Sequence, residues 1–281
     1  MKNIKKLGVI ATILALALSL LAACGGGSTS GGGEVEEEAD KTIKVAASPT
    51  PHAEILNSAA DVLKAEGWTL EVVEFDDYVQ PNVATTDGDV DANYFQHVPY
   101  LEEYNAQNGT NLVSVAGIHY EPMGVYAGIK NSFDDLSDGD KIGIPNDATN
   151  GARALLLLQD NGVIKLKDDA GVTATEQDIA ENPKNITIVP LEAANIPASL
   201  PDLALGVINA NYAIGAELKI DEALATEAAD SLAADTYVNV IVVNEENRDS
   251  EKTKALVAAL KTDDVKKYIT DSYAGAVQPK F

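Results

Sequence analysis

Residues 43–73 read IKVAASPTPHAEILNSAADVLKAEGWTLEVV, and the fold class follows from this stretch. The segment from Ile43 to Ala47 is predicted to form a short strand, residues 51–65 a helix, and the segment from Leu70 to Val73 a second strand. Short strands that alternate with helices indicate βαβ units and a parallel sheet. We therefore predict an α/β fold.

The same alternation continues to the end of the chain. Further strands are predicted at 91–95, 112–118, 124–129, 141–145, 186–189, 204–208 and 237–243, with helices at 98–107, 151–160, 209–216, 251–260 and 263–273. About 240 residues exceed the usual domain of roughly 100–150 residues, which favours two lobes. We predict one lobe from residues 42–125 plus 238–281 and a second from 126–237. Two hinge crossings would leave a cleft between them, a favoured place for a small ligand.

The N-terminus has the pattern of an export signal. Three lysines within the first six residues precede an apolar run from Leu7 to Leu21, which is too short for a membrane-spanning helix of ~20 residues. The run ends in Leu21-Ala22-Ala23-Cys24, which resembles a lipobox. We predict a signal peptide at 1–23, lipid attachment (palmitate) at Cys24, and a flexible Gly-, Ser- and Glu-rich linker at 24–41. The predicted location is the extracytoplasmic face of the cell membrane, with the glycine-rich linker favouring a Gram-positive surface.

Composition excludes several classes of function. The formal charge is −24, or −27 once the three N-terminal lysines leave with the signal peptide, which argues against nucleic acid as a partner. Cys24 is the only cysteine, so the exported chain has neither a disulfide nor a cysteine nucleophile. Gly-x-Ser-x-Gly, Gly-Lys-Ser/Thr phosphate-loop and His-Glu-x-x-His motifs are absent. We predict a ligand-binding protein rather than an enzyme.

The three histidines leave one metal-binding alternative open. His52, His97 and His119 could join Asp76 or Asp91 as ligands of zinc or manganese, since imidazole and carboxylate suit those ions. Their spacing matches no known ligand pattern, and a histidine at a helix start is more often a capping residue. We therefore expect neither a metal nor a cofactor.

Four aromatic residues follow predicted strands. Tyr78, Phe95, His97 and Tyr100 fall in two segments, FDDYVQPN (75–82) and DANYFQHVPYL (91–101). Open α/β sheets bind ligands at such strand ends, although aromatic residues also fill ordinary cores. These side chains are candidates for the wall of a ligand pocket.

A helix start supplies a candidate anion site. In PNDATNGARAL (145–155), Thr149 or Asn150 suits the N-cap and Arg153 lies in the first turn. A ligand carboxylate there would meet free backbone N–H groups, the positive end of the helix dipole and a bidentate guanidinium. The alternative for Arg153 is a surface salt bridge. Asn209 and Asn239 are candidate partners of a ligand ammonium group, or otherwise a turn residue and a residue of the strand ladder.

Together these segments resemble the NlpA family of methionine-binding lipoproteins. The resemblance rests on Asp77-Tyr78-Val79, Ala92 to Leu101, Pro145-Asn146-Asp147 with Asn150 and Arg153, and Glu181-Asn182-Pro183-Lys184-Asn185. It covers the chain from about Ile43 to Phe281. Asn211 departs from it, because other members have threonine or another small residue there.

The resemblance implies a function and roles for individual residues. It implies a type II-like periplasmic-binding-protein fold with two lobes that delivers methionine, L-methionine above all, to an ABC importer made of a membrane permease and an ATPase. Arg153 would pair with the ligand carboxylate, and Asn209 and Asn239 would hold the ammonium and carboxylate groups. Tyr78, Phe95, His97 and Tyr100 would surround the thioether. Another small amino acid, a methionine derivative or a dipeptide is the alternative ligand.

Overall fold

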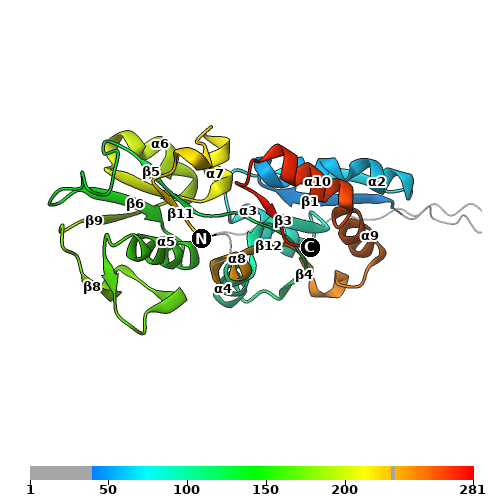
Figure 1. Ribbon diagram of the computed structural model, residues 1–281. Helices are drawn as coiled ribbons and strands as arrows, with labels where there is room; N and C mark the ends of the chain where they lie inside the picture. The colour runs from blue at the N-terminus through cyan, green and yellow to red at the C-terminus, as the bar shows by residue number, and fades with distance from the viewer. Residues whose placement is uncertain (1–39, 229–231) are drawn as a thin grey trace, which may run out of the picture. The chain divides into compact units, whose positions relative to one another are not determined.

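The computed structural model describes residues 40–228 and 232–281, which form two main β-sheets (Figure 1). The first has the order β13 (Gln278–Pro279), β4 (Leu112–Tyr120), β12 (Val238–Asn244), β3 (Ala92–His97), β1 (Thr42–Ala47), β2 (Thr69–Glu74). The second has the order β11 (Ala225–Thr226), β5 (Gly124–Ala127), β10 (Leu205–Ile208), β6 (Lys141–Pro145), β9 (Thr187–Leu191). The predicted signal peptide, Cys24 and the linker up to residue 39 lie outside the described residues.

Both sheets are mixed, which corrects the prediction of a parallel sheet. Strand β1 pairs in parallel with β2 and β3, and β6 pairs in parallel with β9 and β10. Strand β12, however, runs antiparallel to β3 and β4, and β5 runs antiparallel to β10 and β11. Parallel neighbours need a crossover within one sheet. Strands β5 and β12 instead arrive from the other sheet, so their direction is free of that constraint.

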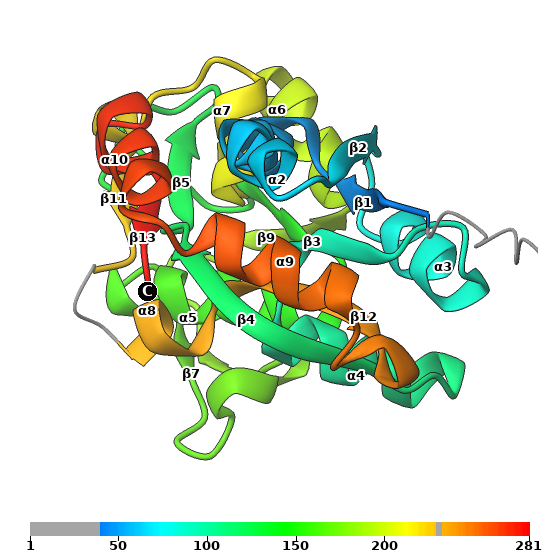
Figure 2. The same cartoon turned by 90° about the vertical axis from the view of Figure 1, so that its right-hand side faces the viewer.

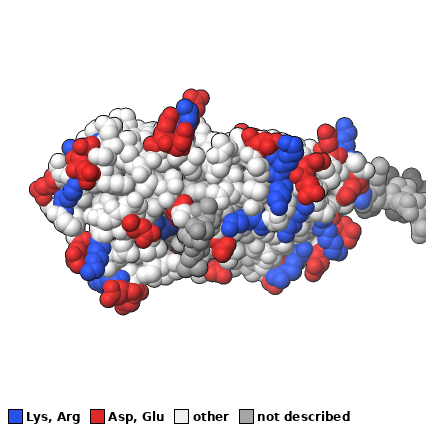
Figure 3. All heavy atoms as spheres, viewed as in Figure 1, with Lys and Arg blue, Asp and Glu red and all other residues white. Residues whose placement is uncertain are grey.

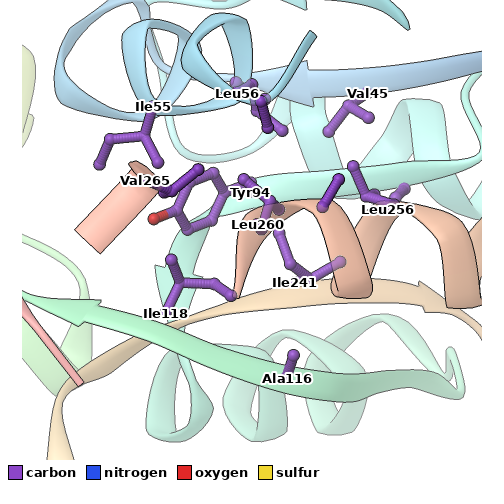
Figure 4. Packing of buried hydrophobic residues seen from close by; sticks show 14 of the residues in the cluster. Val45, Ile55, Leu56, Tyr94, Ala116, Ile118, Ile241, Leu256, Leu260 and Val265 are labelled. Carbon is purple, nitrogen blue, oxygen red and sulfur yellow. The ribbon is translucent and has the colours of Figure 1, made fainter. Parts of the chain in front are cut away.

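Helices cover both faces of the six-stranded sheet. Ile241 and Val243 of β12 pack into a core with Leu56, Leu256 and Val265, while Val240 and Val242 face the opposite side, as the alternation of a strand requires (Figure 4). Figure 2 shows α2, α9 and α10 on one side of this sheet. The helices are η1 (Pro49–Ala53), α1 (Glu54–Ser58), α2 (Ala60–Ala65), α3 (Gln80–Asp87), α4 (Val98–Asn108), α9 (Glu251–Leu260) and α10 (Asp263–Ser272).

The five-stranded sheet has its own apolar cores. Helix α5 (Ala148–Asp160) packs Leu155 and Leu158 against Ile142 and Val207 of the strands, whereas Ile196 and Leu203 belong to a neighbouring cluster. Shorter elements complete this part: α6 (Ile196–Ser199), α7 (Ala210–Gly215), α8 (Leu232–Thr236), β7 (Lys165–Leu166), β8 (Ile179–Glu181) and 3-10 turns at 171–173, 176–178, 193–195, 200–202 and 220–222. Another 3-10 turn, at 245–247, follows β12.

The chain passes between the two sheets twice. Strand β4 ends at Tyr120 in the first sheet and β5 begins at Gly124 in the second, so residues 121–123 make one connection. Strand β11 ends at Thr226 and β12 begins at Val238, so residues 227–237 make the other. The first connection precedes the predicted lobe boundary at residues 125/126 by a few residues, because β5 already belongs to the second sheet.

Local structure departs from the sequence prediction at two helices. The single helix predicted at 51–65 is divided into η1, α1 and α2, with a break at Ala59. Helix α3 was not predicted, because it begins without a polar N-cap at Val79, although Pro81 in its first turn is favourable for a helix start. Within the described residues, no helix has the length and apolar character needed to cross a membrane. Acidic and basic side chains are interspersed over the face shown in Figure 3.

Candidate functional site

A narrow cavity lies where the two sheets meet the first connection. Its volume is about 20 Å³, which is room for one water molecule. All eight pocket residues predicted from sequence line it, together with five that were not predicted. The lining residues are His52, Tyr78, Phe95, Gln96, His97, Tyr100, Glu121, Asn150, Arg153, Asn209, Ala210, Asn211 and Asn239. An amino acid therefore enters only if the walls of the cavity separate.

One side of the cavity is aromatic. The ring centroid of Tyr78 lies 5.9 Å from those of Phe95 and Tyr100, and 4.9 Å from that of Tyr212. The hydroxyl of Tyr78 donates to Asn211 Oδ1 at 2.6 Å, and that of Tyr100 donates to the carbonyl of Tyr78 at 2.9 Å. These hydrogen bonds hold the rings in place. Tyr212, which was not predicted, joins the cluster from α7.

His97 combines a structural role with a place in the cavity wall. It is the N-cap of α4, where its Nδ1 accepts from the backbone N–H of Tyr100 at 3.3 Å. Nδ1 is therefore unprotonated and Nε2 carries the hydrogen, which points to Asn150 Oδ1 at 3.2 Å. Burial lowers the pKa of His97 to about 3. His97 is thus a neutral ring whose two nitrogens are both engaged.

The start of α5 differs from the prediction. The N-cap is Asp147, whose Oδ1 accepts from the backbone N–H of Asn150 at 2.9 Å, rather than Thr149 or Asn150. An aspartate can reach the N–H three residues on, and it already supplies negative charge at the positive end of the helix. A ligand carboxylate would therefore share the N-terminus of α5 with the carboxylate of Asp147. The Asn150 side chain also donates to Asp147 and accepts from Asn209 Nδ2 at 2.9 Å.

Arg153 forms an ion pair, but a buried one rather than the surface salt bridge considered from sequence. Its Nε and Nη2 donate to the two carboxylate oxygens of Glu227 at 2.7 and 2.5 Å, and the two side chains are only 5% and 8% exposed. Nη2 also donates to the carbonyl of Glu121 at 2.7 Å, and the Tyr237 ring lies 4.4 Å from the guanidinium carbon. Arg153 lines the cavity, and within the described residues these hydrogen bonds use Nε and Nη2 and none is made by Nη1.

The pair sets the charge of both partners. Burial alone would raise the pKa of Glu227, but Arg153 more than offsets this, and the pKa of the carboxyl group lies below its usual value. Burial alone would likewise lower the pKa of Arg153, yet Glu227 raises it. Glu227 also accepts from the Tyr120 hydroxyl at 2.8 Å and from the Met123 N–H at 2.9 Å. The guanidinium charge is therefore neutralised within the protein.

Glu121, in the first connection between the sheets, is the most informative residue that the sequence prediction missed. Its Oε1 accepts from Nε2 of His119 at 2.6 Å and lies 3.3 Å from Nε2 of His52, and the backbone N–H of Asn211 lowers the pKa of its carboxyl group. The Tyr94 hydroxyl contacts Nδ1 of His119 from the other side. The sequence signal is a lone acid in the otherwise apolar stretch GIHYEPMGV (117–125).

The carboxyl group of Glu121 forms no ion pair with a lysine or arginine of the described residues; Arg153 lowers its pKa only through space, while Nη2 of Arg153 donates to the backbone carbonyl of Glu121. Burial lowers the pKa of His52 to about 4 and that of His119 to about 3, so both rings are neutral at pH 7. Burial also raises the pKa of Glu121. Because neutral imidazoles donate a hydrogen bond without supplying charge, this carboxyl group is under-compensated compared with Glu227.

The same three side chains are the only described group of histidines and acids close enough to hold a metal ion, with ligand atoms within 4.8 Å of one another. His97 lies apart from them, on Asn150, and Asp91 is paired with Lys252 at 3.0 Å. The metal set considered from sequence is therefore not assembled. Nε2 of His119 donates to Glu121 and Nε2 of His52 donates to Asn239 Oδ1, so the group is part of a hydrogen-bonded network.

The two remaining asparagines present different groups to the cavity. Asn239 Oδ1 lies 3.0 Å from Nε2 of His52, so its amide nitrogen is left for other partners. Asn209 donates through Nδ2 to Asn150, and its buried Oδ1 has no partner among the described residues. A buried acceptor without a donor costs free energy unless a ligand supplies one.

Comparison with known proteins identifies close relatives. The model of the NlpA lipoprotein family matches residues 43–281. The D-methionine-binding lipoprotein MetQ of Salmonella typhimurium is 42% identical over 265 residues, covering 92% of this chain and 93% of the relative. A lipoprotein structure from Ruminococcus gnavus is 58% identical with a TM-score of 0.85, covering 86% of this chain and all of that one.

One solved relative contains a ligand. A nutrient binding protein from Burkholderia cenocepacia bound to methionine is 42% identical, with a TM-score of 0.80, and covers 85% of this chain and 100% of its own. The match to the family model, residues 43–281, includes every lining residue of the cavity.

Proposed function

Because the chain belongs to the NlpA lipoprotein family, we propose that it is the methionine-binding receptor of an ABC importer. It captures methionine in the cavity between its two sheets and delivers it to a membrane permease that is powered by an ATPase. Its relatives are substrate-binding proteins rather than enzymes. The observation that carries the proposal is the composition of the cavity, which places aromatic rings, a guanidinium and unpaired amide groups around one small space.

The cavity is suited to both ends of a zwitterionic amino acid. Arg153 offers Nη1 to the ligand carboxylate, as a single contact rather than the bidentate one expected from sequence, because Glu227 occupies its other two nitrogens. The amide nitrogen of Asn239 supports the same carboxylate. Asn209 Oδ1 accepts from the ligand ammonium group, which supplies the missing donor.

The aromatic side is suited to a thioether. Tyr78, Phe95 and Tyr100 present ring faces and edges to the cavity, and the neutral ring of His97 closes the same side. A polarizable sulfur gains about 0.3–1.5 kcal/mol from such contacts. A straight-chain hydrocarbon of equal length gains burial but not this contribution.

Capture requires relative motion of the two sheets. Residues 40–120 with 238–281 form one proposed lobe and residues 124–226 the other, joined by the connections at 121–123 and 227–237. Rotation about two connections opens the cavity to admit methionine and closes it around the ligand. The proposed lipid on Cys24 keeps the receptor at the outer face of the membrane, within reach of its permease.

Isothermal titration calorimetry of the detergent-solubilised full chain tests the proposal. The protein is first unfolded, dialysed and refolded to remove any ligand that copurifies. We expect micromolar or tighter binding of L-methionine, with D-methionine and the other common amino acids as competitors. Tight binding of a different amino acid with no binding of either methionine isomer would overturn the substrate assignment.

A further inference from the structure

Two buried carboxyl groups lie at or next to the cavity, and within the described residues only one forms an ion pair with a lysine or arginine: Glu121 lines the cavity, whereas Glu227 is paired with the lining residue Arg153. Glu227 accepts two hydrogen bonds from Arg153, one from the Tyr120 hydroxyl and one from the Met123 N–H. Arg153 and Glu227 together contribute no net charge to the site. The ligand carboxylate therefore meets a guanidinium whose charge has already been balanced.

Glu121 is the other carboxyl group. Its side chain is 7% exposed and lines the cavity, its hydrogen-bond donor is the uncharged ring of His119, and the uncharged ring of His52 lies 3.3 Å away. Asn209 Oδ1 adds a second acceptor that has no donor among the described residues. The described cavity wall thus has a surplus of acceptors and lacks a cation that belongs to Glu121.

From this distribution of charge we infer that the α-ammonium group is the part of the ligand on which binding depends most, and that Glu121 is its counter-ion. The inference rests on the proposed methionine function. The ligand class is therefore primary ammonium compounds with a methionine side chain, and it includes derivatives whose carboxyl group is uncharged, such as L-methioninamide.

The ammonium group and the carboxylate of the ligand differ in which protein groups are left unpaired when each is removed. A ligand without the ammonium group closes the cavity over Glu121 and Asn209 with no donor for either, and a buried group without its partner is costly. A ligand without the carboxylate charge leaves the Arg153–Glu227 pair intact. The amide oxygen of such a ligand still accepts a hydrogen bond from Nη1 of Arg153.

The test is a ligand series on the unmodified full chain, titrated by calorimetry at pH 6.5, below the α-amino pKa of roughly 7.7–8.0. We expect L-methioninamide to bind within about tenfold of L-methionine and 4-(methylthio)butanoate, which lacks the amino group, to bind at least about 100-fold more weakly; a factor of ten corresponds to about 1.4 kcal/mol. An amide that binds as weakly as the butanoate, or more weakly, would overturn the inference. Failure of L-methionine itself would instead overturn the proposed function.

Two single variants test whether the dependence of binding on the ligand ammonium group arises from Glu121. Glu121→Gln keeps the size of the side chain and removes its charge, so the difference in affinity between L-methionine and 4-(methylthio)butanoate should shrink at least tenfold. The matched control is Glu192→Gln, which removes an exposed acid near Tyr100 and Tyr212. An unchanged difference in Glu121→Gln, or an equal reduction in the control, would show that Glu121 is not the counter-ion.

Discussion

Glu227 and Glu121 are two buried carboxyl groups, one paired with the lining residue Arg153 and one in the cavity wall itself, and their pKa values are shifted in opposite directions. Arg153 holds the pKa of Glu227 below its usual value, whereas burial raises that of Glu121 even though the charge of Arg153 opposes the shift. The cost of burying the first is offset inside the protein. The cost of burying Glu121 remains until a cation binds beside it. We therefore assign Glu227 to the positioning of Arg153 and Glu121 to contact with the ligand.

The difference between the two carboxyl groups depends on the histidines beside Glu121 being neutral. Acid unfolding tests their protonation state, and it is the test with the largest expected effect. The folded pKa values of His52, His97 and His119 lie at about 4, 3 and 3, below the unfolded value of about 6.5. The stability from keeping them neutral is fully present above pH 6.5. It is lost as pH falls toward 4, because the unfolded chain binds protons that the folded chain does not.

Three such histidines should lower the free energy of unfolding by about 4 kcal/mol per pH unit near pH 5. The raised pKa of Glu121 acts within this window and in the opposite direction, because the folded chain binds that proton first, whereas the lowered pKa of Glu227 acts only below about pH 4.5. One carboxyl group does not outweigh three histidines, so the sign of the slope is unchanged. Urea unfolding from pH 7.5 to 4.5 measures the slope, and His97→Asn should reduce it by about a third. A free energy that stays constant down to pH 5 would mean that the histidines are charged in the folded state.

Breaking the ion pair should have the next largest effect. Arg153→Ala leaves Glu227 buried without its cation, so the free energy of unfolding should fall by about 3–5 kcal/mol and methionine binding should be lost. The double variant Arg153→Met with Glu227→Leu removes both charges and should recover most of the stability but none of the binding. Urea unfolding and calorimetry measure the two properties. Methionine binding by the double variant would contradict the role of Arg153.

Removing the charge of Glu121 should affect binding far more than folding. Because Glu121 forms no ion pair with a lysine or arginine of the described residues, Glu121→Gln should change the free energy of unfolding by less than about 1 kcal/mol while it weakens L-methionine at least tenfold. Glu227→Gln is the matched variant and should destabilise the fold by several times as much, because it leaves Arg153 unpaired. Equal loss of stability in both variants would remove the distinction between the two carboxyl groups.

The smallest effect is expected on the aromatic side, which carries no charge. Phe95→Leu keeps the cavity apolar but removes a ring edge, so L-methionine should bind about 2- to 10-fold more weakly, in line with 0.3–1.5 kcal/mol for a sulfur–aromatic contact. Norleucine, which has a methylene in place of sulfur, is the control ligand and should lose less. An equal loss for both ligands would mean that the ring contributes shape alone.

The sequence predicted much of the fold where periodicity is strong. Helix α5 and strand β12 were predicted within a few residues of their bounds. The helix has a long apolar face and the strand a long apolar run, and both patterns can be recognised in a single sequence. The direction of β12 was not predicted, since it depends on the sheet from which the strand arrives. Helix α3 was missed because nothing at Val79 marks its start.

The sequence named the individual candidate residues of the site, which stay a prediction as ligand contacts, but it did not predict how they pair with one another. Strand ends and helix starts pointed to Tyr78, Arg153 and Asn209, which line one cavity. The partner of Arg153 is 74 residues away, directly after the two-residue strand β11, and a local sequence pattern carries no information about such a contact. Glu121 escaped notice because a single acid after a strand is common, and only its burial between two histidines distinguishes it.

A crystal structure of the chain with L-methionine bound tests the central claim most directly. We expect the ligand nitrogen within hydrogen-bonding distance of the Glu121 carboxyl group and of Asn209 Oδ1, with the ligand carboxylate on Nη1 of Arg153 and the Arg153–Glu227 pair intact. A methionine whose carboxylate displaces Glu227 from Arg153, or whose nitrogen lies away from Glu121, would contradict it.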